Sequence, residues 1–299
     1  MSDIFNIIGN TPVVELKKIN NTKARIFAKL ENLNPSGSIK DVMAWYIVKQ
    51  AEKRRELKKG QEIIEVTSGN TGISFAMISA IRGYKFTAIM PENMSKERTD
   101  MMKAFGAKVI LTPAKKDMAG ACKKFDQYIK NHPKAFLPRQ FCNPDNFRAH
   151  EEITYKEFRR QVAHKIDFFV AGIGTGGTLM GMANALHRHN PKAKIIGIEP
   201  AESAVINGKK AGTHGIQGIG EGFIPELVDV KKIDKTIAVS TKDSIKMARR
   251  LALEEGLMVG ISSGTNVLAC LEIAKKNPGA VIATVLPDRG ERYLSMGLY

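Results

Sequence analysis

The chain has 299 residues, 43% of them apolar, which is enough for two compact domains of ordinary size and excludes a disordered or fibrous protein. Its formal net charge is +16. The lysines are spread over every amphipathic segment and form no tract with interleaved aromatic residues, so we expect a solvated surface and no nucleic-acid binding. The three cysteines are few and far apart, which indicates reduced thiols and neither disulfides nor a metal site: Cys122, Cys142 and Cys270.

The opening residues, MSDIFNIIGNTPVVEL, contain no basic segment followed by an apolar one. No apolar run along the chain approaches the length that spans a bilayer. We therefore expect a cytoplasmic protein that makes no use of a membrane.

Short apolar or β-branched runs alternate with amphipathic stretches along the chain. This alternation is typical of an α/β fold with largely parallel sheets. The expected strands are 25–30, 62–66, 85–90, 108–112, 167–172 and 194–199, and the expected helices are 39–57, 70–82, 95–105, 116–130 and 177–189.

One segment, 140–150, carries an Asn-Pro turn signal and is the best candidate for a crossing between two lobes. A second boundary is expected near 33–35. We therefore predict a smaller lobe over 36–145 and a larger lobe formed by 1–35 together with 146–299.

The loop NPSGSIKD, residues 34–41, places Lys40 after small residues and at the start of an amphipathic helix. One interpretation is an amine that forms a Schiff base with a carbonyl cofactor, which requires surroundings that disfavour the ammonium form. The other is an ordinary surface lysine in the first turn of a helix. The loop alone does not decide between them.

The loop TSGNTG, residues 67–72, joins an expected strand to an expected helix. Its backbone amides and hydroxyl groups converge at a helix N-terminus, a place that binds anions such as an amino-acid carboxylate. A plain strand-to-helix turn, with Asn70 as the N-cap residue, is the alternative.

The loop AGIGTGGT, residues 171–178, follows a buried strand and opens another helix, so its amides can surround a phosphate. Its glycines also satisfy the dinucleotide-binding pattern GxGxxG at Gly172, Gly174 and Gly177. Glu199 ends the next strand at about the position where that fold places an acid. A nicotinamide-dependent oxidoreductase is therefore an alternative.

A fourth loop, GISSGT at 260–265, contains Ser262. Its hydroxyl group is suited either to a hydrogen bond with a ring nitrogen or to capping the helix that follows.

In order and spacing, NPSGSIKD, TSGNTG, GIGTGGT, GIGEGF, GISSGT and LPDRGERY resemble the cysteine synthase and cystathionine β-synthase family. The resemblance spans 7–294 and displaces the nicotinamide interpretation. It implies a tryptophan synthase β-like fold, with two α/β lobes, each a twisted, largely parallel sheet flanked by helices, and with pyridoxal 5′-phosphate in the cleft between the lobes. It also implies a homodimer, and that the smaller lobe is mobile and binds the substrate carboxylate while the larger carries the phosphate loop.

The resemblance also assigns roles to individual residues. Lys40 corresponds to the Schiff-base lysine, Asn70 to the partner of the ring hydroxyl, Ser262 to that of the pyridine nitrogen, and Asp288 to a residue near the ring. The expected phosphate site is Gly174, Thr175, Gly176, Gly177 and Thr178. The expected substrate-binding residues are Thr67, Ser68, Gly69, Asn70, Thr71 and Gln140 for the carboxylate, and Gly218, Gly220 and Glu221 for the pocket behind the cofactor.

The activity that the resemblance implies is β-replacement on a serine-derived amino acid through an α-aminoacrylate, with Lys40 as general base. Cysteine synthesis from O-acetylserine and sulfide is the first candidate. In the alternative, cysteine is the first substrate and sulfide leaves, as in cystathionine β-synthase-like, lanthionine-forming or desulfhydrase reactions. Family members also bind the C-terminal peptide of serine acetyltransferase, but an intact Lys40 argues against a purely binding protein.

Three residues depart from the pattern of typical cysteine synthases: Val42, Glu221 and Arg289 stand where arginine, alanine and serine are usual. Of these three residues, Glu221 has the greatest consequence for which substrate we expect. An acid near the pocket is suited to steer an incoming amino group or to activate a nucleophile. A side chain that faces solvent is the alternative.

Overall fold

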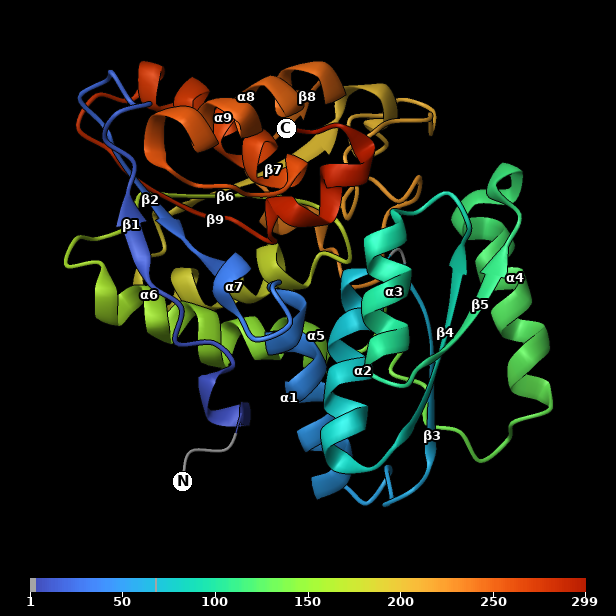
Figure 1. Cartoon of the computed structure of the whole chain (residues 1–299). Coiled ribbons are helices and arrows are strands. Elements are labelled where there is room, and N and C mark those ends of the chain that lie inside the picture. Colours follow the sequence, from blue (N-terminus) through green and yellow to red (C-terminus); the bar gives the residue numbers. More distant parts are fainter. Residues whose placement is uncertain (1–3, 68) are drawn as a thin grey trace.

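The fold is built on two separate sheets (Figure 1), and the computed structural model describes residues 4–67 and 69–299. Six strands form the larger sheet in the order β1-β2-β9-β6-β7-β8. Its neighbouring strands are parallel, except that β1 and β2 are antiparallel. The strands are β1 (Val13–Glu15), β2 (Arg25–Lys29), β6 (Phe168–Gly172), β7 (Lys194–Pro200), β8 (Lys235–Val239) and β9 (Val281–Val285).

Three parallel strands form the smaller sheet in the order β3-β4-β5. Its central strand is buried from residue 86 to residue 91, as expected for a parallel strand covered on both faces. The strands are β3 (Glu62–Val66), β4 (Lys85–Pro91) and β5 (Lys108–Thr112).

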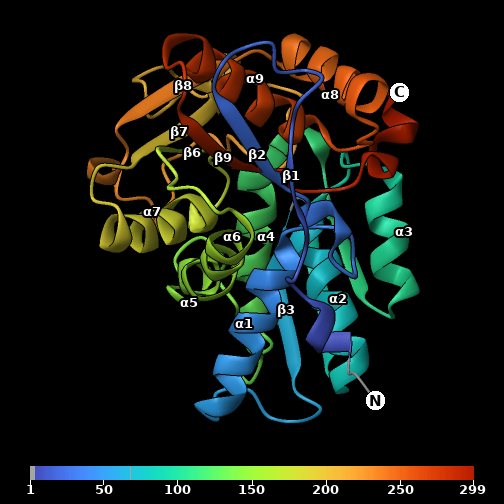
Figure 2. The same cartoon turned by 90° about the vertical axis from the view of Figure 1, so that its left-hand side faces the viewer.

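Helices cover both faces of the larger sheet (Figures 1 and 2). Two of them, α8 and α9, pack against each other, and α9 contacts the central strands from one side. The helix α7 contacts β6 from the other side, with α6 beside it. Their bounds are α6 (Tyr155–Gln161), α7 (Gly177–His189), α8 (Thr241–Glu255) and α9 (Ile261–Lys276).

The smaller sheet lies between α2 and α3 on one face and α4 on the other (Figure 1). The helix α1 packs against α2 and against α5, which a π-helical turn (His150–Thr154) joins to α6. The bounds are α1 (Lys40–Lys53), α2 (Asn70–Arg82), α3 (Lys96–Ala104), α4 (Asp117–Lys130) and α5 (Asp145–Ala149).

The α/β class and the order of the expected elements are confirmed, with one difference at a helix end. The helix expected over 39–57 ends at Lys53, and Arg55 follows in the left-handed conformation with a φ of 62°. The helix after residue 240 has Ser240 as its N-cap, because the Ser240 Oγ accepts a hydrogen bond of 3.1 Å from the Asp243 amide. Thr241 is thus its first residue.

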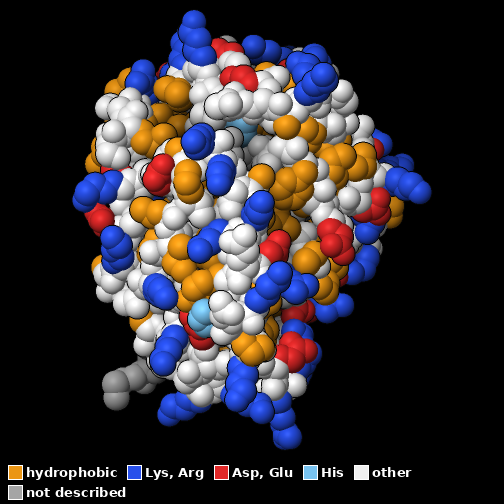
Figure 3. Space-filling view, turned by 90° about the vertical axis from the view of Figure 1, so that its right-hand side faces the viewer, with side chains coloured by type: hydrophobic (Ala, Val, Ile, Leu, Met, Phe, Trp, Pro, Cys, Tyr) orange, Lys and Arg blue, Asp and Glu red, His pale blue; other side chains and the backbone are white. Residues whose placement is uncertain are grey.

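Lys and Arg side chains are scattered over the face shown in Figure 3, with apolar and acidic groups between them. The three cysteines are free thiols. Within the described part of the chain, no group of histidine, cysteine and acidic side chains is arranged to hold a metal ion. No helix among the described residues has both the length and the apolar character needed to cross a bilayer.

Candidate active site

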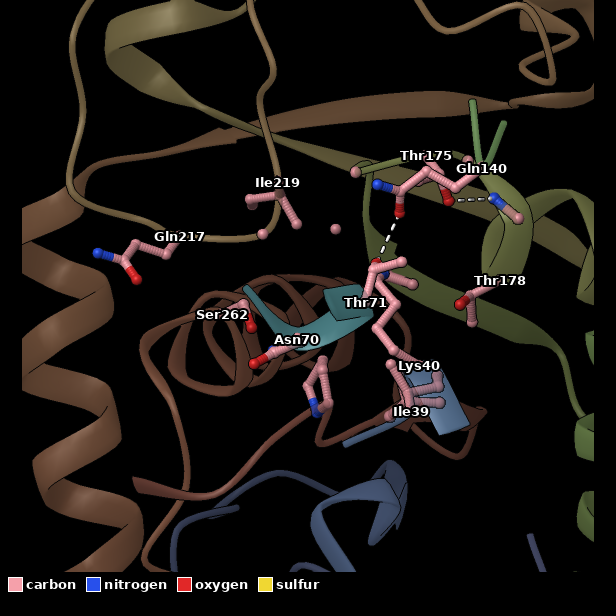
Figure 4. Close-up of a pocket in the computed structure, with 18 of the residues that line it drawn as sticks. Ile39, Lys40, Asn70, Thr71, Gln140, Thr175, Thr178, Gln217, Ile219 and Ser262 are labelled. Atoms are coloured by element: carbon pink, nitrogen blue, oxygen red, sulfur yellow. Dashed lines mark hydrogen bonds between the residues drawn. The ribbon is translucent and has the colours of Figure 1, made fainter. Parts of the chain in front are cut away.

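Four helices begin at one cavity between the two sheets (Figure 4). Lys40, Asn70 and Gly177 are the first residues of α1, α2 and α7, Ser262 is the second residue of α9, and all four line the cavity. The first turn of a helix has unpaired N–H groups and a partial positive charge. The cavity is therefore suited to anionic groups such as phosphate and carboxylate.

Lys40 directs its side chain into this cavity (Figure 4). Burial lowers the pKa of its ammonium group, while the negative charges of Glu221 and Asp288 act in the opposite direction and only partly compensate. A lowered pKa increases the neutral amine fraction, the form that attacks a carbonyl carbon. The surface-lysine interpretation is therefore wrong.

The loop between β6 and α7 accepts only glycine at several positions. A Cβ on Gly174 would lie 2.3 Å from the Gly218 carbonyl oxygen, and one on Gly177 would lie 1.9 Å from Asn146 Oδ1. Gly176 has a φ of 83°, which disfavours any residue with a side chain. The loop thus presents bare backbone to the cavity at the start of α7, the arrangement that binds phosphate.

Beside this loop lies a histidine that sequence reasoning did not single out. Nε2 of His150 is 3.3 Å from the hydroxyl oxygen of Thr178, and Nδ1 is 3.0 Å from that of Thr154. Burial, with a smaller contribution from the charge of Lys40, lowers the pKa of His150 to about 3. The imidazole is therefore neutral at physiological pH and orients the Thr178 hydroxyl group without adding charge.

Thr71 and Gln140 form one wall of the cavity (Figure 4). The Thr71 hydroxyl donates a 2.6 Å hydrogen bond to Gln140 Oε1, and Gln140 Nε2 donates to the Val66 carbonyl over 2.9 Å. The backbone N–H of Gln140 donates to a carboxyl oxygen of Glu65 over 3.1 Å. The wall is held by hydrogen bonds that tie Gln140 to the end of β3.

Thr67 and Gly69, also expected at the carboxylate site, are absent from the lining of the cavity. The Thr67 hydroxyl oxygen accepts hydrogen bonds from the amides of Gly69 (2.9 Å) and Gly72 (3.2 Å), so it shapes the turn from behind. A Cβ on Gly69 would lie 2.0 Å from the Arg98 side chain. Ser68, the remaining residue of this group, lies outside the described residues.

Asp288 lies behind Asn70, away from the cavity lining. The Asn70 side-chain amide donates to Asp288 Oδ2 over 2.7 Å, while its carbonyl oxygen accepts from Arg292, a residue whose contact sequence reasoning missed. Tyr293 donates to the same Asp288 oxygen over 2.8 Å. These bonds fix the orientation of the Asn70 carboxamide.

Neither Asn70 nor Ser262 is a helix cap. The N-cap residues of α2 and α9 are Gly69 and Gly260, and neither helix start has a side-chain cap bond. Ser262 is 5% exposed and lines the cavity, and its hydroxyl group makes no hydrogen bond with another described residue. Its hydroxyl group is available to a bound molecule.

The loop 218–223 closes the cavity on another side. Gly218 and Glu221 line it, whereas Gly220 lines only the adjoining outer cavity. Burial raises the pKa of Glu221, and the charge of Lys40 acts in the opposite direction. Glu221 is half-buried and lines the cavity, so it is not a purely solvent-facing side chain.

Glu199, the acid of the nicotinamide alternative, is 2% exposed and fully engaged. Its two carboxylate oxygens accept from the amides of Ile206 (2.7 Å) and Asn207 (3.1 Å), and from the Asn207 side chain (3.0 Å). A carboxylate used in this way is not free to bind a ribose.

Comparison with known proteins agrees with this geometry. The family model described as "Pyridoxal-phosphate dependent enzyme" matches residues 4–288. Cysteine synthase B of Campylobacter jejuni is 46% identical over 296 residues, which are 99% of this chain and 98% of that protein. The crystal structure of cysteine synthase from Entamoeba histolytica superposes with a TM-score of 0.95 at 45% sequence identity. The match covers 100% of this chain and 90% of the Entamoeba chain. A hydrogen sulfide-producing enzyme from Fusobacterium nucleatum has a TM-score of 0.92 at 42% identity, with coverages of 98% and 90%.

Proposed function

Because this chain belongs to the cysteine synthase family of pyridoxal-phosphate-dependent enzymes, we propose that it joins sulfide to the β-carbon of O-acetylserine and releases cysteine and acetate. The observation that best supports this reaction is the convergence of Lys40, the loop 174–178 and the Thr71–Gln140 wall on one cavity. An amine, a phosphate site and a carboxylate site are the three functions that the reaction requires.

The residues present fit the cofactor. The amine of Lys40 has a lowered pKa, the glycines of 174–178 leave space that a Cβ would fill, and the Ser262 hydroxyl has no partner among the described residues. Lys40 would hold the cofactor covalently, Gly174–Thr178 its phosphate, Asn70 the ring hydroxyl and Ser262 the ring nitrogen. Bound pyridoxal phosphate supplies an electron-withdrawing ring that stabilises negative charge at the α-carbon of an amino acid.

The chain's own residues would position the amino acid and move its protons. Asn70, Thr71 and Gln140 would bind the carboxylate at the positive end of α2. The Lys40 amine, released when the substrate binds, would take the proton from the α-carbon and later return it. Ser262, a neutral hydroxyl, would leave the ring nitrogen without a firmly held proton, which favours loss of the β-substituent.

The division into a smaller lobe over 36–145 and a larger lobe of 1–35 and 146–299 is part of the proposal. It is supported by the position of the carboxylate wall beside the smaller sheet and of the phosphate loop beside the larger. Movement of the smaller lobe toward the larger would exclude water from the cavity. Small-angle scattering before and after O-acetylserine binding would detect such a closure as a smaller radius of gyration.

We further propose a cytoplasmic homodimer that binds the C-terminal peptide of serine acetyltransferase in the same cleft. A peptide carboxylate would occupy the Thr71–Gln140 wall and would therefore compete with the amino-acid substrate. Sedimentation tests the dimer. The shared site is tested by inhibition with this peptide, which added O-acetylserine should relieve.

The first experiment measures the visible absorption band of the purified, cofactor-loaded protein and its consumption of sulfide. O-acetylserine should change the band, and sulfide should restore it while cysteine accumulates. Lys40→Ala should lower the rate at least about 1,000-fold. Lys53→Ala, at the exposed far end of α1, is the matched control and should retain the wild-type rate. A loaded protein that consumes no sulfide would contradict the proposal.

The second candidate uses cysteine as first substrate and releases sulfide. The similarity to the hydrogen sulfide-producing enzyme of Fusobacterium nucleatum favours it, as does Glu221 where cysteine synthases typically have alanine. The same protein sample distinguishes the two candidates. Sulfide accumulation with cysteine alone, without consumption of O-acetylserine, would establish the second direction of sulfur flow.

A further inference from the structure

The first turn of α3 joins the two proposed lobes. In Figures 1 and 2, α3 lies beside the C-terminal helical segment Gly290–Met296, and the two elements are in contact. The two carboxylate oxygens of Glu97 accept hydrogen bonds from Ser295, one from its backbone N–H over 3.0 Å and one from its hydroxyl over 2.7 Å. The smaller lobe, which contains α3, is bonded here to the end of the larger lobe.

Arg98, the next residue of α3, is 1% exposed and lines the active-site cavity. Its Nη1 donates hydrogen bonds to the Gln217 side chain and, over 3.2 Å, to the Ser95 hydroxyl, and its guanidinium carbon lies 4.8 Å from the centre of the Tyr293 ring. Nη2 is 3.7 Å from Asp288 Oδ2, which is longer than a charge-assisted hydrogen bond. Nε has no hydrogen-bond partner among the described residues. Burial of an imperfectly paired charge costs free energy of folding, so stability alone does not account for an arginine here.

The side chain of Arg98 also supports the loop 67–72. A Cβ on Gly69 would lie 2.0 Å from Arg98 Cδ, so the methylene groups of the arginine fill the space beside this glycine. One residue further, the Asn70 side-chain amide donates to Asp288 Oδ2, the same oxygen that faces Arg98. The loop that we propose to bind the substrate carboxylate therefore rests on an arginine whose guanidinium contacts the larger lobe.

This close contact transmits movement of the loop to α3. Because no space separates Gly69 from Arg98, the loop cannot shift toward a bound carboxylate without moving the arginine. Arg98 lines the same cavity, so the negative charge of the carboxylate also attracts its guanidinium. Figure 4 shows Gln217, the partner of Arg98 in the larger lobe, on the other side of the cavity from Lys40.

We infer that Arg98 is a positioning residue that couples occupancy of the carboxylate site to the contact between α3 and the segment Gly290–Met296. This inference rests on the proposed function, because it names the residue through which a bound amino acid holds the smaller lobe on the larger. Arg98 acts through Gly69 and Gln217 and transfers no proton in the reaction.

Hydrogen exchange of the backbone segment 290–297 reports this coupling, because the Ser295 N–H donates to Glu97 across the lobes. The experiment compares the cofactor-loaded protein with and without L-alanine, an amino acid that has no β-substituent to lose. In the wild type, saturating L-alanine should slow exchange of 290–297 at least about threefold. In Arg98→Met, which keeps an apolar side chain beside Gly69 but removes the charge, this slowing should disappear.

The same variant should separate KM from kcat. In Arg98→Met the KM for O-acetylserine should rise about tenfold while kcat stays within about twofold, because a misplaced loop weakens carboxylate binding but leaves Lys40 in position. Arg98→Lys retains the charge but lacks the planar fork that faces Gln217 and Asp288 together, so it should recover only part of both effects. Lys103→Met, exposed in the last turn of α3, is the matched control and should match the wild type in exchange and kinetics.

The outcomes separate this inference from the proposed function. If L-alanine slows no exchange in 290–297 of the wild type, or slows it equally in Arg98→Met, the coupling is overturned while sulfide consumption still supports cysteine synthesis. A loaded protein that shows neither slowed exchange nor sulfide consumption would overturn both. If Arg98→Met does not fold, Gln217→Ala removes the acceptor on the larger lobe instead and should weaken the slowing, and an unchanged slowing in that variant would also overturn the coupling.

Discussion

The two glycine-containing loops of the active site differ in the partners that hold their shapes. In the loop 172–178, the space beside Gly174 is filled by the Gly218 backbone and the space beside Gly176 by Val228. In the loop 67–72, Gly69 packs closely against Arg98, and side-chain hydrogen bonds add to this packing: Thr67 accepts from two amides and Thr71 donates to Gln140. Both loops combine packing with hydrogen bonds, but the phosphate loop bonds to the uncharged side chains of Asn146 and Asn266. The bonds of the carboxylate loop lead through Gln140 to the titratable Glu65.

This difference matters because packing and hydrogen bonding respond to different changes. An added methyl group in a filled space forces the backbone to move, whereas a change of pH leaves the packing of apolar groups unaltered. A hydrogen-bonded turn tolerates modest changes of volume but depends on the protonation of its partners. Substitutions and pH should therefore separate the two loops.

The largest effect is expected from Gly176→Ala. The new Cβ would lie 2.3 Å from Val228 in a backbone with a φ of 83°. We expect bound cofactor to fall at least about tenfold and the free energy of unfolding to fall by about 3 kcal/mol, from left-handed strain plus overpacking. Cofactor absorbance and urea unfolding measure the two losses.

Gly208→Ala is the matched control, because Gly208 has a φ of 80° but no atom within 4 Å of the added Cβ. It should show only the left-handed strain, about 1 kcal/mol, and retain its cofactor. If both variants behaved alike, packing would not be what shapes the phosphate loop.

The next effect concerns pH and the carboxylate loop. Burial raises the pKa of Glu65, which supports Gln140, to about 8. The folded protein then binds more protons than the unfolded chain between about pH 5 and pH 8, so the free energy of unfolding falls as pH rises through that range. Glu65→Gln should reduce the fall in the free energy of unfolding between pH 5 and pH 8 by about 3.5 kcal/mol.

Urea unfolding at several pH values measures this slope, with the exposed Glu226→Gln as control. Burial also raises the pKa of Glu31, to about 7, so part of the slope should persist in Glu65→Gln. A slope identical to that of the wild type would show that Glu65 is already ionised in the folded protein.

A smaller effect is expected from Thr71→Val, which keeps the volume but removes the hydroxyl that donates to Gln140. The KM for O-acetylserine should rise about tenfold, equivalent to about 1.4 kcal/mol, while cofactor content stays unchanged. Steady-state kinetics provide the measurement. Thr112→Val, which removes a buried hydroxyl on β5 away from the cavity, should leave KM as it is. Loss of cofactor in Thr71→Val would mean that the two loops are not independent.

The smallest effect on stability is expected from Ser262→Ala. Its hydroxyl has no partner among the described residues, so the free energy of unfolding of the cofactor-free protein should change by less than about 0.5 kcal/mol. The visible absorption of the bound cofactor should nevertheless shift. Ser263→Ala, the buried neighbour outside the cavity lining, should not alter the spectrum. Identical spectra for both variants would remove Ser262 from the cofactor site.

Local pattern predicted much of this site because its parts are helix starts. Glycine and small polar residues between a buried strand and an amphipathic segment predicted where α2, α7 and α9 begin, and the family resemblance grouped those starts. The capping interpretations of Asn70 and Ser262 failed because glycines occupy the cap positions. A sequence pattern places a polar residue near a helix start, but it does not settle which residue is the cap.

Other parts of the site depend on contacts between distant segments, which no local pattern reveals. Nη2 of Arg98, on α3, lies 3.7 Å from Oδ2 of Asp288, and the Arg292 guanidinium donates a hydrogen bond to the Asn70 side-chain oxygen. His150, close to Thr178, stands in a segment where only a turn was apparent from sequence. The two lobe boundaries also stay a prediction.

The order of strands in the larger sheet has a consequence for the protein as it leaves the ribosome. The strand β9 lies between β2 and β6, so the sheet remains split until residue 285 has been synthesised. The smaller sheet, by contrast, has all of its strands once residue 112 has emerged. A nascent chain therefore carries Lys40 and a complete smaller sheet while β2 still exposes an unpaired edge, and an interruption of translation before residue 281 leaves that edge open to aggregation.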